Sequence, residues 1–161
     1  MIDSVQSQLQ GRQEMTQAQT LGSMHREKSP DDIRDICQNY LATFSTRNIA
    51  AIVKNHAVDG TFWLRAGGPA VKGRDAIGAT FAGFFAQWPN FGYEVHRTLF
   101  TERQWILDWT ATADLRQADG TLRQVRFDCL DVVDVDADGL VVRKDTFVDL
   151  VQVQAARALG N

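Results

Sequence analysis

The stretch from Arg123 to Leu150 constrains the fold most, because it predicts two β-strands joined by one tight turn. The turn falls at residues 136–139, where Gly139 can adopt the positive φ that β-branched neighbours would resist. The apolar residues of the first strand alternate and share one face: Phe127, Cys129, Val133 and Val135. Asp131 lies on that same face. Either the strand twists or bulges there and lets Asp131 reach water, or this carboxyl lies at the bottom of a pocket.

The composition is that of an ordinary globular domain. The chain has 161 residues, of which 44% are hydrophobic and 23% charged, with a net charge of −3. This length suits one domain that buries its own core. The charge offers no basic surface for nucleic acid, and no window approaches the ~18 apolar residues of a membrane span. We expect a cytoplasmic protein whose two cysteines, Cys37 and Cys129, are reduced core thiols.

The chain divides into three parts. Residues 1–29 are rich in Gln, Ser and Thr and predict a flexible arm, residues 30–155 form the domain, and residues 156–161 form a tail. Ser29 and Pro30 predict the start of the first helix, with Ser29 as its cap.

Hydrophobic spacing and turn residues predict the later elements. In chain order they are a helix at 48–55, a strand at 58–65, a helix at 73–88, strands at 91–100 and 104–116, and the two strands of 123–150. Helices first and long strands last indicate an α+β domain, with a curved, mostly antiparallel sheet wrapped by three N-terminal helices.

Four segments resemble the nuclear-transport-factor-2-like superfamily, in particular its SnoaL-like branch of small-molecule enzymes. They are the helix ending NYLATF, the segment NIAAIVKNHAVDGTF, the helix start KGRDAIGATFAGFF and the terminal DGLVVRKDTFVDL. The resemblance covers roughly residues 31–150. It implies a cone-shaped fold that encloses an apolar pocket, in a homodimer that uses the outer face of the sheet.

The residues also allow comparison with individual branches of the superfamily. The segment GRDAI at 73–77 resembles limonene epoxide hydrolase, but the Asp-Arg-Asp set of that enzyme falls on Thr110, Thr112 and Thr146 here. Without those charged groups we do not expect epoxide hydrolysis.

Ketosteroid isomerase offers a second comparison. Its helix tyrosine falls on Tyr40, and its protonated aspartic acid falls on Asp131. An apolar wall would keep such a carboxyl protonated, as a hydrogen-bond donor beside a phenol. The base aspartate of that family falls on Leu64 or Arg65, so the same isomerisation is not expected.

The dehydratases of this fold, scytalone dehydratase and the bile-acid dehydratase, offer a third comparison. Their tyrosine and histidine fall on Tyr40 and His96, and an aspartate of the bile-acid enzyme falls near Asp114. Loss of water from a β-hydroxy ketone needs a base and an acid, and histidine can act as both. This comparison retains the most residues.

The resulting candidate catalytic residues are His96, Tyr40 and Asp131. Asp128 would replace Asp131 if the strand were shifted by one residue. The strand 104–116 has a tryptophan face and a threonine face, and we favour the threonine face as the one that lines the pocket. The candidate substrate-binding residues are Phe44, Phe62, Trp63, Phe81, Thr110, Thr112, Asp114 and Phe127.

These residues predict a cofactor-free enzyme that acts on a hydrophobic hydroxylated or carbonyl small molecule by proton transfer. Dehydration, isomerisation and aldol-type cyclisation all remain open. A ligand-binding protein without catalysis, and a structural subunit like the small subunit of ring-hydroxylating dioxygenases, are the alternatives. No metal site is expected, because His25, His56 and His96 lie far apart in different elements.

Overall fold

The computed structural model describes residues 28–158 of the chain. The arm predicted over residues 1–29 lies, except for its last two residues, outside the described part. In chain order the elements are α2 (Pro30–Ser45), α3 (Ile49–Lys54), β1 (His56–Arg65), β2 (Val71–Lys72), α4 (Arg74–Gln87), β3 (Gly92–Phe100), β4 (Gln104–Arg116), β5 (Leu122–Val135), β6 (Val141–Val148) and α5 (Leu150–Ala158). The predicted order of helices and strands is confirmed.

Helix α2 begins where the sequence predicts, because its first turn is capped by side chains. The Ser29 hydroxyl accepts a 3.2 Å hydrogen bond from the Asp32 amide, and the Asp32 carboxylate accepts a 2.7 Å bond from the Ser29 amide. This reciprocal capping box satisfies amides that the helix itself leaves unpaired. The buried face of α2 carries Ile33, Cys37 and Tyr40, so Tyr40 points toward the sheet.

The six strands form one curved sheet in the order β2-β1-β6-β5-β4-β3. Within residues 28–158, β1 pairs with β6 in parallel and the other strand pairs are antiparallel. The turn between β5 and β6 contains Gly139 at a φ of 84°, as its position predicts. The register that follows from this turn sets Asp131 opposite Thr146 on β6 and Leu107 on β4.

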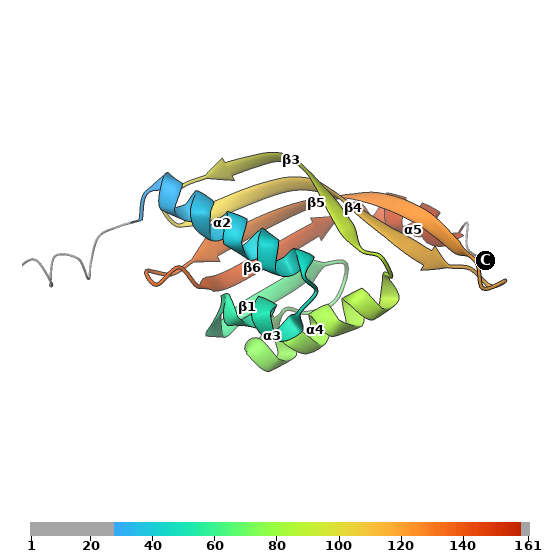
Figure 1. Ribbon diagram of the computed structural model, residues 1–161, viewed down its shortest axis with the longest axis horizontal. Coiled ribbons are helices and arrows are strands. Elements are labelled where there is room, and N and C mark those ends of the chain that lie inside the picture. The colour runs from blue at the N-terminus through green and yellow to red at the C-terminus, as the bar shows by residue number, and fades with distance from the viewer. Residues whose placement is uncertain (1–27, 159–161) are drawn as a thin grey trace, which may run out of the picture.

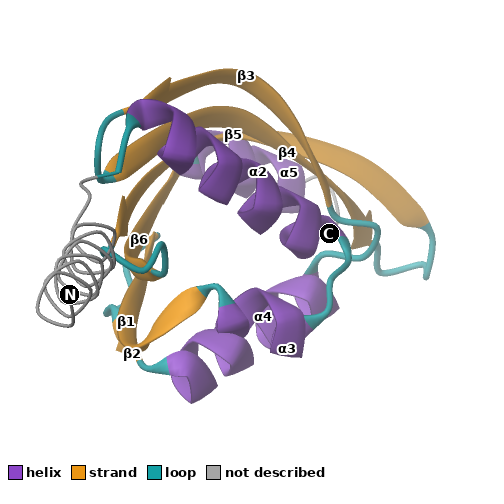
Figure 2. Ribbon diagram, turned by 60° about the vertical axis from the view of Figure 1, so that its left-hand side comes forward, coloured by secondary structure: helices purple, strands orange, loops and turns teal. Residues whose placement is uncertain are grey.

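Helices α2, α3 and α4 cover one side of the sheet, as Figures 1 and 2 show. The core between these helices and the strands mixes aliphatic and aromatic side chains. Trp105 of β4 and Phe127 of β5 belong to one cluster with residues of α2, and Phe81 of α4 belongs to a second cluster. The α+β fold with three helices wrapped on a curved, mostly antiparallel sheet is therefore confirmed. Among residues 28–158, no helix is both long and apolar enough to cross a membrane.

Three local predictions differ from the structure. Strand β1 begins at His56, two residues earlier than expected, and the short strand β2 was not predicted. Helix α5 was not predicted either, and it covers Leu150–Ala158. It packs beside β5 beyond the end of β6, where the Asp149 amide donates a 2.9 Å hydrogen bond to the Asp128 carbonyl. Only Val153 and Ala156 of α5 are buried, which is too few for a clear helical pattern.

The tryptophan face of β4 looks into the molecule, which corrects the preference for the threonine face. Trp105, Leu107 and Trp109 are at most 7% exposed, and the helices cover this face. Removing these large side chains from water stabilises the fold far more than burying threonine methyl groups would. The opposite face, with Thr110 and Thr112, is the outer face of the sheet.

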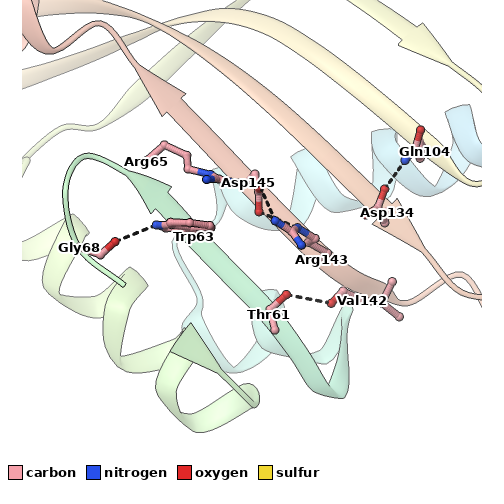
Figure 3. Close-up of polar contacts among 9 residues, drawn as sticks. All are labelled: Thr61, Trp63, Arg65, Gly68, Gln104, Asp134, Val142, Arg143 and Asp145. Atoms are coloured by element: carbon pink, nitrogen blue, oxygen red, sulfur yellow. Dashed lines mark hydrogen bonds and ion pairs between the residues drawn. The ribbon is translucent and has the colours of Figure 1, made fainter. Parts of the chain in front are cut away.

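The outer face also carries Trp63, which was expected in the pocket. Figure 3 shows Trp63, Arg65, Arg143 and Asp145 side by side on β1 and β6. Arg65 donates a 2.6 Å hydrogen bond to Asp145 and lies 3.3 Å from the centre of the Trp63 ring. Arg143 binds the same carboxylate at 2.9 Å. Burial alone would raise the pKa of Asp145, but the hydrogen bonds from Arg143 and Arg65 outweigh it and lower this pKa.

Candidate active site

A cavity of about 240 Å³ lies between the helices and the inner face of the sheet. About half of the residues that line it are aromatic, and they include four predicted substrate-binding residues: Phe44, Phe62, Phe81 and Phe127. Among the described residues that line it, only Asp131 and Lys144 are charged. The cavity is therefore mostly apolar, and its charged side chains belong to one polar group from α2, β5 and β6.

Asp131 and Lys144 form a buried ion pair in this polar group. Lys144 Nζ donates to Asp131 Oδ2, and Thr146 Oγ1 donates a 2.7 Å hydrogen bond to Asp131 Oδ1. Asp131 is 3% exposed and Lys144 is 5% exposed. The pairing of β5 with β6 explains the contact, because Thr146 stands opposite Asp131 and Lys144 lies two residues before it on the same face.

Tyr40 adds a phenol to the polar group from the opposite side. Its ring centre lies 5.6 Å from Lys144 Nζ. Burial raises the pKa of Tyr40 well above its usual value, and the negative charge of Asp131 raises it further. Tyr40 is therefore a neutral hydrogen-bond donor at physiological pH.

His56 lies behind Tyr40, and the sequence predicts neither a catalytic nor a metal-binding role for it. Its Nε2 atom is 3.2 Å from the Tyr40 hydroxyl, while Nδ1 is buried with no hydrogen-bond partner among the described residues. Burial lowers the pKa of His56 to about 3, and the positive charges of Lys144 and Arg74 contribute to this shift. The imidazole is therefore neutral, and it holds the hydroxyl end of Tyr40 in place.

Asp131, and not Asp128, belongs to the cavity. Asp131 lines it, as the pocket explanation of this carboxyl predicts, whereas Asp128 points to the outer face. There it accepts hydrogen bonds from Thr110 at 2.7 Å and from Gln152 at 2.9 Å. These hydrogen bonds lower the pKa of Asp128. The hairpin turn thus selects the carboxyl that reaches the cavity.

His96 does not line the cavity, which corrects its place in the predicted catalytic set. A bulge between Val95 and Arg97 interrupts the pairing of β3 with β4 at this residue. Its Nε2 atom lies 2.7 Å from Thr110 Oγ1 on the outer face. The sheet therefore separates His96 from Tyr40 and Asp131, because side chains on opposite faces of a strand cannot meet.

The other predicted polar residues of β4 lie outside the cavity as well. Thr110, Thr112 and Asp114 share the outer face with His96, and Asp114 accepts a 2.6 Å hydrogen bond from Asn90. The three residues were expected in the cavity because the wrong face of β4 was chosen. Alternate residues of a strand share a face, so one wrong choice misplaces all residues of that face together.

Lys144 is the residue that the sequence reasoning missed. Counted from Gly139, Lys144 and Thr146 have the parity that faces Asp131 across the hairpin, so the signal was present in the spacing. A lysine next to Arg143 instead predicts a solvent-exposed segment of the strand, because lysine is rarely buried. No group of three or more His, Cys, Asp or Glu side chains within residues 28–158 could hold a metal ion.

A family model described as the SnoaL-like domain matches residues 37–144. The match covers more than half of the chain, so the protein belongs to the SnoaL-like family, within the nuclear-transport-factor-2-like superfamily. No curated protein matches the chain.

Solved structures have the same fold. A protein from Shewanella putrefaciens, provisionally assigned as a SnoaL-like polyketide cyclase, has a TM-score of 0.70 at 8% identity over 79% of this chain and 86% of its own. One from Jannaschia with the same provisional assignment has a TM-score of 0.69 at 15% identity over 82% and 96%. A protein from Streptomyces galilaeus, provisionally assigned as a hydroxylase, has a TM-score of 0.66 at 17% identity over 80% and 96%.

Proposed function

We propose that this protein is a SnoaL-like enzyme that transfers a proton within a hydrophobic small molecule bearing a carbonyl or hydroxyl group. One observation carries the proposal: among the residues that the structure describes, the lining of the largely apolar cavity contains a single charged pair, Asp131 with Lys144. A buried ion pair stabilises a fold no better than apolar residues of similar size would. Charged groups retained in such a cavity are therefore candidates for chemistry.

Each polar side chain has a role that fits its position. The Asp131 carboxylate acts as the base that removes a proton from the carbon beside the carbonyl. Lys144 and the neutral phenol of Tyr40 donate hydrogen bonds to the carbonyl oxygen as negative charge develops on it. Donors held in an apolar, water-poor site stabilise such charge more strongly than they would in water.

The size and the wall of the cavity favour a substrate of one or two rings. Its volume is about 240 Å³. A cavity of about 150 Å³ admits benzene, and pockets for drug-sized ligands typically have roughly 300 to 1,000 Å³, so this cavity lies between the two. Phe44, Phe62, Phe81 and Phe127 present flat apolar surfaces for contact with such rings. Proton transfer of this kind needs no cofactor and serves dehydration, isomerisation or aldol-type cyclisation equally.

Solvent isotope exchange tests the proposal without knowledge of the natural substrate. In heavy water, the protein should speed deuterium incorporation beside the carbonyl of benzylacetone, a one-ring ketone, as followed by NMR. Asp131→Asn should reduce this exchange by about 10²-fold or more, the usual contribution of a general base. Asp128→Asn removes a carboxylate from the outer face of the same strand and should leave the exchange rate unchanged.

A second function is supported by the hydrogen bonds on Asp131. Both of its oxygens already accept hydrogen bonds, from Lys144 and Thr146, so the carboxylate is satisfied without a proton from a ligand. The same cavity could then bind an oxygen-bearing apolar ligand without turnover. Two results together would favour this function and contradict catalysis. Benzylacetone should bind saturably, and the protein should accelerate deuterium exchange for neither benzylacetone nor a range of similar ketones.

A further inference from the structure

We propose that Lys144 is a nucleophilic lysine, which condenses with the carbonyl group of an aldehyde or ketone in the cavity to form an imine. The inference rests on the proposed function in one respect, namely that the cavity receives carbonyl compounds. It goes further by assigning a covalent bond between the protein and its ligand.

The position of Lys144 sets it apart from the other lysines. The chain contains four lysines, Lys28, Lys54, Lys72 and Lys144. Lys54 and Lys72 are exposed and Lys28 is half-buried, whereas Lys144 is 5% exposed and lines the cavity. A carbonyl compound held against the aromatic wall is therefore placed beside this amine, which raises the effective concentration of the two reacting groups.

Asp131 can accept the proton of Lys144. This matters because only the neutral amine can attack a carbonyl carbon. The carboxylate contacts Lys144 Nζ directly through Oδ2. When an apolar ligand displaces water from the cavity, the cost of keeping two opposite charges there rises. A proton can then pass from Nζ to Oδ2 with no change in net charge, leaving a neutral amine and a carboxylic acid. Thr146 holds the other oxygen and so keeps Oδ2 directed at the lysine.

The condensation balances within this group of residues. The Nζ lone pair forms a bond to the carbonyl carbon, the carbonyl π pair moves to the oxygen, and one proton passes from nitrogen to that oxygen. Asp131 returns its proton to the hydroxyl of the resulting carbinolamine, which leaves as water while the nitrogen lone pair forms the C=N bond. The products are a protonated imine on Lys144, the Asp131 carboxylate and one water molecule.

Tyr40 is placed to assist this step. Its ring lies 5.6 Å from Nζ, and its hydroxyl remains protonated because burial raises the pKa of Tyr40. A neutral phenol can donate to the carbinolamine oxygen without adding charge to the site. The protonated imine would also acidify the neighbouring C–H group, and the Asp131 carboxylate regenerated beside it is the nearest base.

Reductive trapping tests the inference. The full chain is incubated with hydrocinnamaldehyde, a one-ring aldehyde, and sodium cyanoborohydride, and the labelled lysines are located by peptide mass spectrometry. Lys144 should be labelled about tenfold faster than Lys54 or Lys72, owing to its proximity to the bound aldehyde. Benzylacetone in excess should slow labelling of Lys144 alone. Labelling of Lys144 at or below the rate of the exposed lysines would overturn the inference.

Variants separate this inference from the proposed function. Lys144→Arg keeps a cation beside Asp131 but cannot form an imine, and Lys72→Arg is the matched control at an exposed site. Lys144→Arg should abolish the trapped adduct at this position, whereas Lys72→Arg should not. If wild type exchanges benzylacetone protons and Lys144 is not trapped, the imine is wrong and electrostatic proton transfer stands. If Lys144 is trapped selectively and no exchange occurs, the covalent bond stands and the proton-transfer function fails. Asp131→Asn should slow trapping at Lys144 and leave Lys72 unaffected.

Discussion

Lys144 on β6 and Asp131 on β5 form an ion pair with side chains no more than 6% exposed. Removing either partner leaves an uncompensated buried charge, so Asp131→Asn and Lys144→Met should each destabilise the protein by about 3–5 kcal/mol. The double variant Asp131→Leu, Lys144→Met should lose less than either single variant, because no charge remains in the cavity. Urea unfolding followed by circular dichroism measures all three free energies.

The exposed pair of Arg126 and Glu94 provides the control for this comparison. It has two hydrogen bonds, of 2.5 Å and 2.8 Å, but both side chains are about half exposed. Glu94→Gln should therefore change stability little. A loss for Glu94→Gln as large as that for Asp131→Asn would contradict the importance of burial.

The neutral state of His56 makes stability depend on pH. Its pKa in the folded protein is lowered to about 3, whereas an unfolded chain binds this proton near pH 6.5. The contribution of the neutral imidazole to the free energy of unfolding is therefore complete above about pH 6.5. It is lost as pH falls toward 3, by about 1.4 kcal/mol per pH unit. Urea unfolding at several pH values between about 7 and 5 measures the slope of the free energy of unfolding against pH. Most carboxyl groups titrate below this range.

His56→Gln should reduce that slope, because glutamine binds no proton in this range. His96→Gln removes a histidine from the outer face and is the matched variant. Equal slopes for wild type and His56→Gln would show that the buried imidazole does not drive the pH dependence.

The two cysteines should be unreactive while the protein is folded. Both are buried and unpaired, as the sequence predicts. Burial raises the pKa of Cys37 to about 11 and that of Cys129 to about 12, so almost no reactive thiolate is present near pH 8. A thiol reagent such as dithionitrobenzoate should react slowly with native protein and rapidly with both thiols in urea. Immediate reaction of the native protein would contradict these burial assignments.

Gly139 should resist replacement for two separable reasons. Its φ is 84°, and a Cβ atom there would lie 2.9 Å from Ile36 Cδ1. Gly120 has the same φ with open space around it, so Gly120→Ala measures backbone strain alone, expected at about 1–2 kcal/mol. Gly139→Ala should cost more than Gly120→Ala, and Ile36→Val in the Gly139→Ala background should recover the difference. Thermal or urea unfolding measures these changes.

The homodimer implied by the family resemblance stays a prediction. The outer side of the sheet exposes two large apolar side chains, Leu130 by 36% and Phe147 by 41%, and we predict that they lie in the interface. Leu130→Lys and Phe147→Lys should therefore weaken self-association in analytical ultracentrifugation. Val151→Lys, on α5 at a position 76% exposed, is the control. Wild-type protein that sediments as a monomer at all concentrations would contradict the prediction.

The sequence by itself determined the features that depend on neighbouring residues. Ser29 and Pro30 start α2 because a cap acts within one helical turn. Gly139 sets the register of the β5–β6 hairpin because its φ defines the turn, and that register sets Asp131 opposite Thr146. Residue order and local spacing contain all the information that these predictions need.

Only the tertiary structure decided which faces meet. A strand pattern shows that Thr110 and Trp109 point in opposite directions, but it does not say which side the helices cover. That choice moved His96 out of the cavity, with the bulge in β3. It also turned the pair of Lys144 and Asp131, which the hairpin register brings together, toward the helices and away from solvent. The site depends on long-range packing because Tyr40 comes from α2, and no spacing along the chain measures its distance from the β5–β6 hairpin.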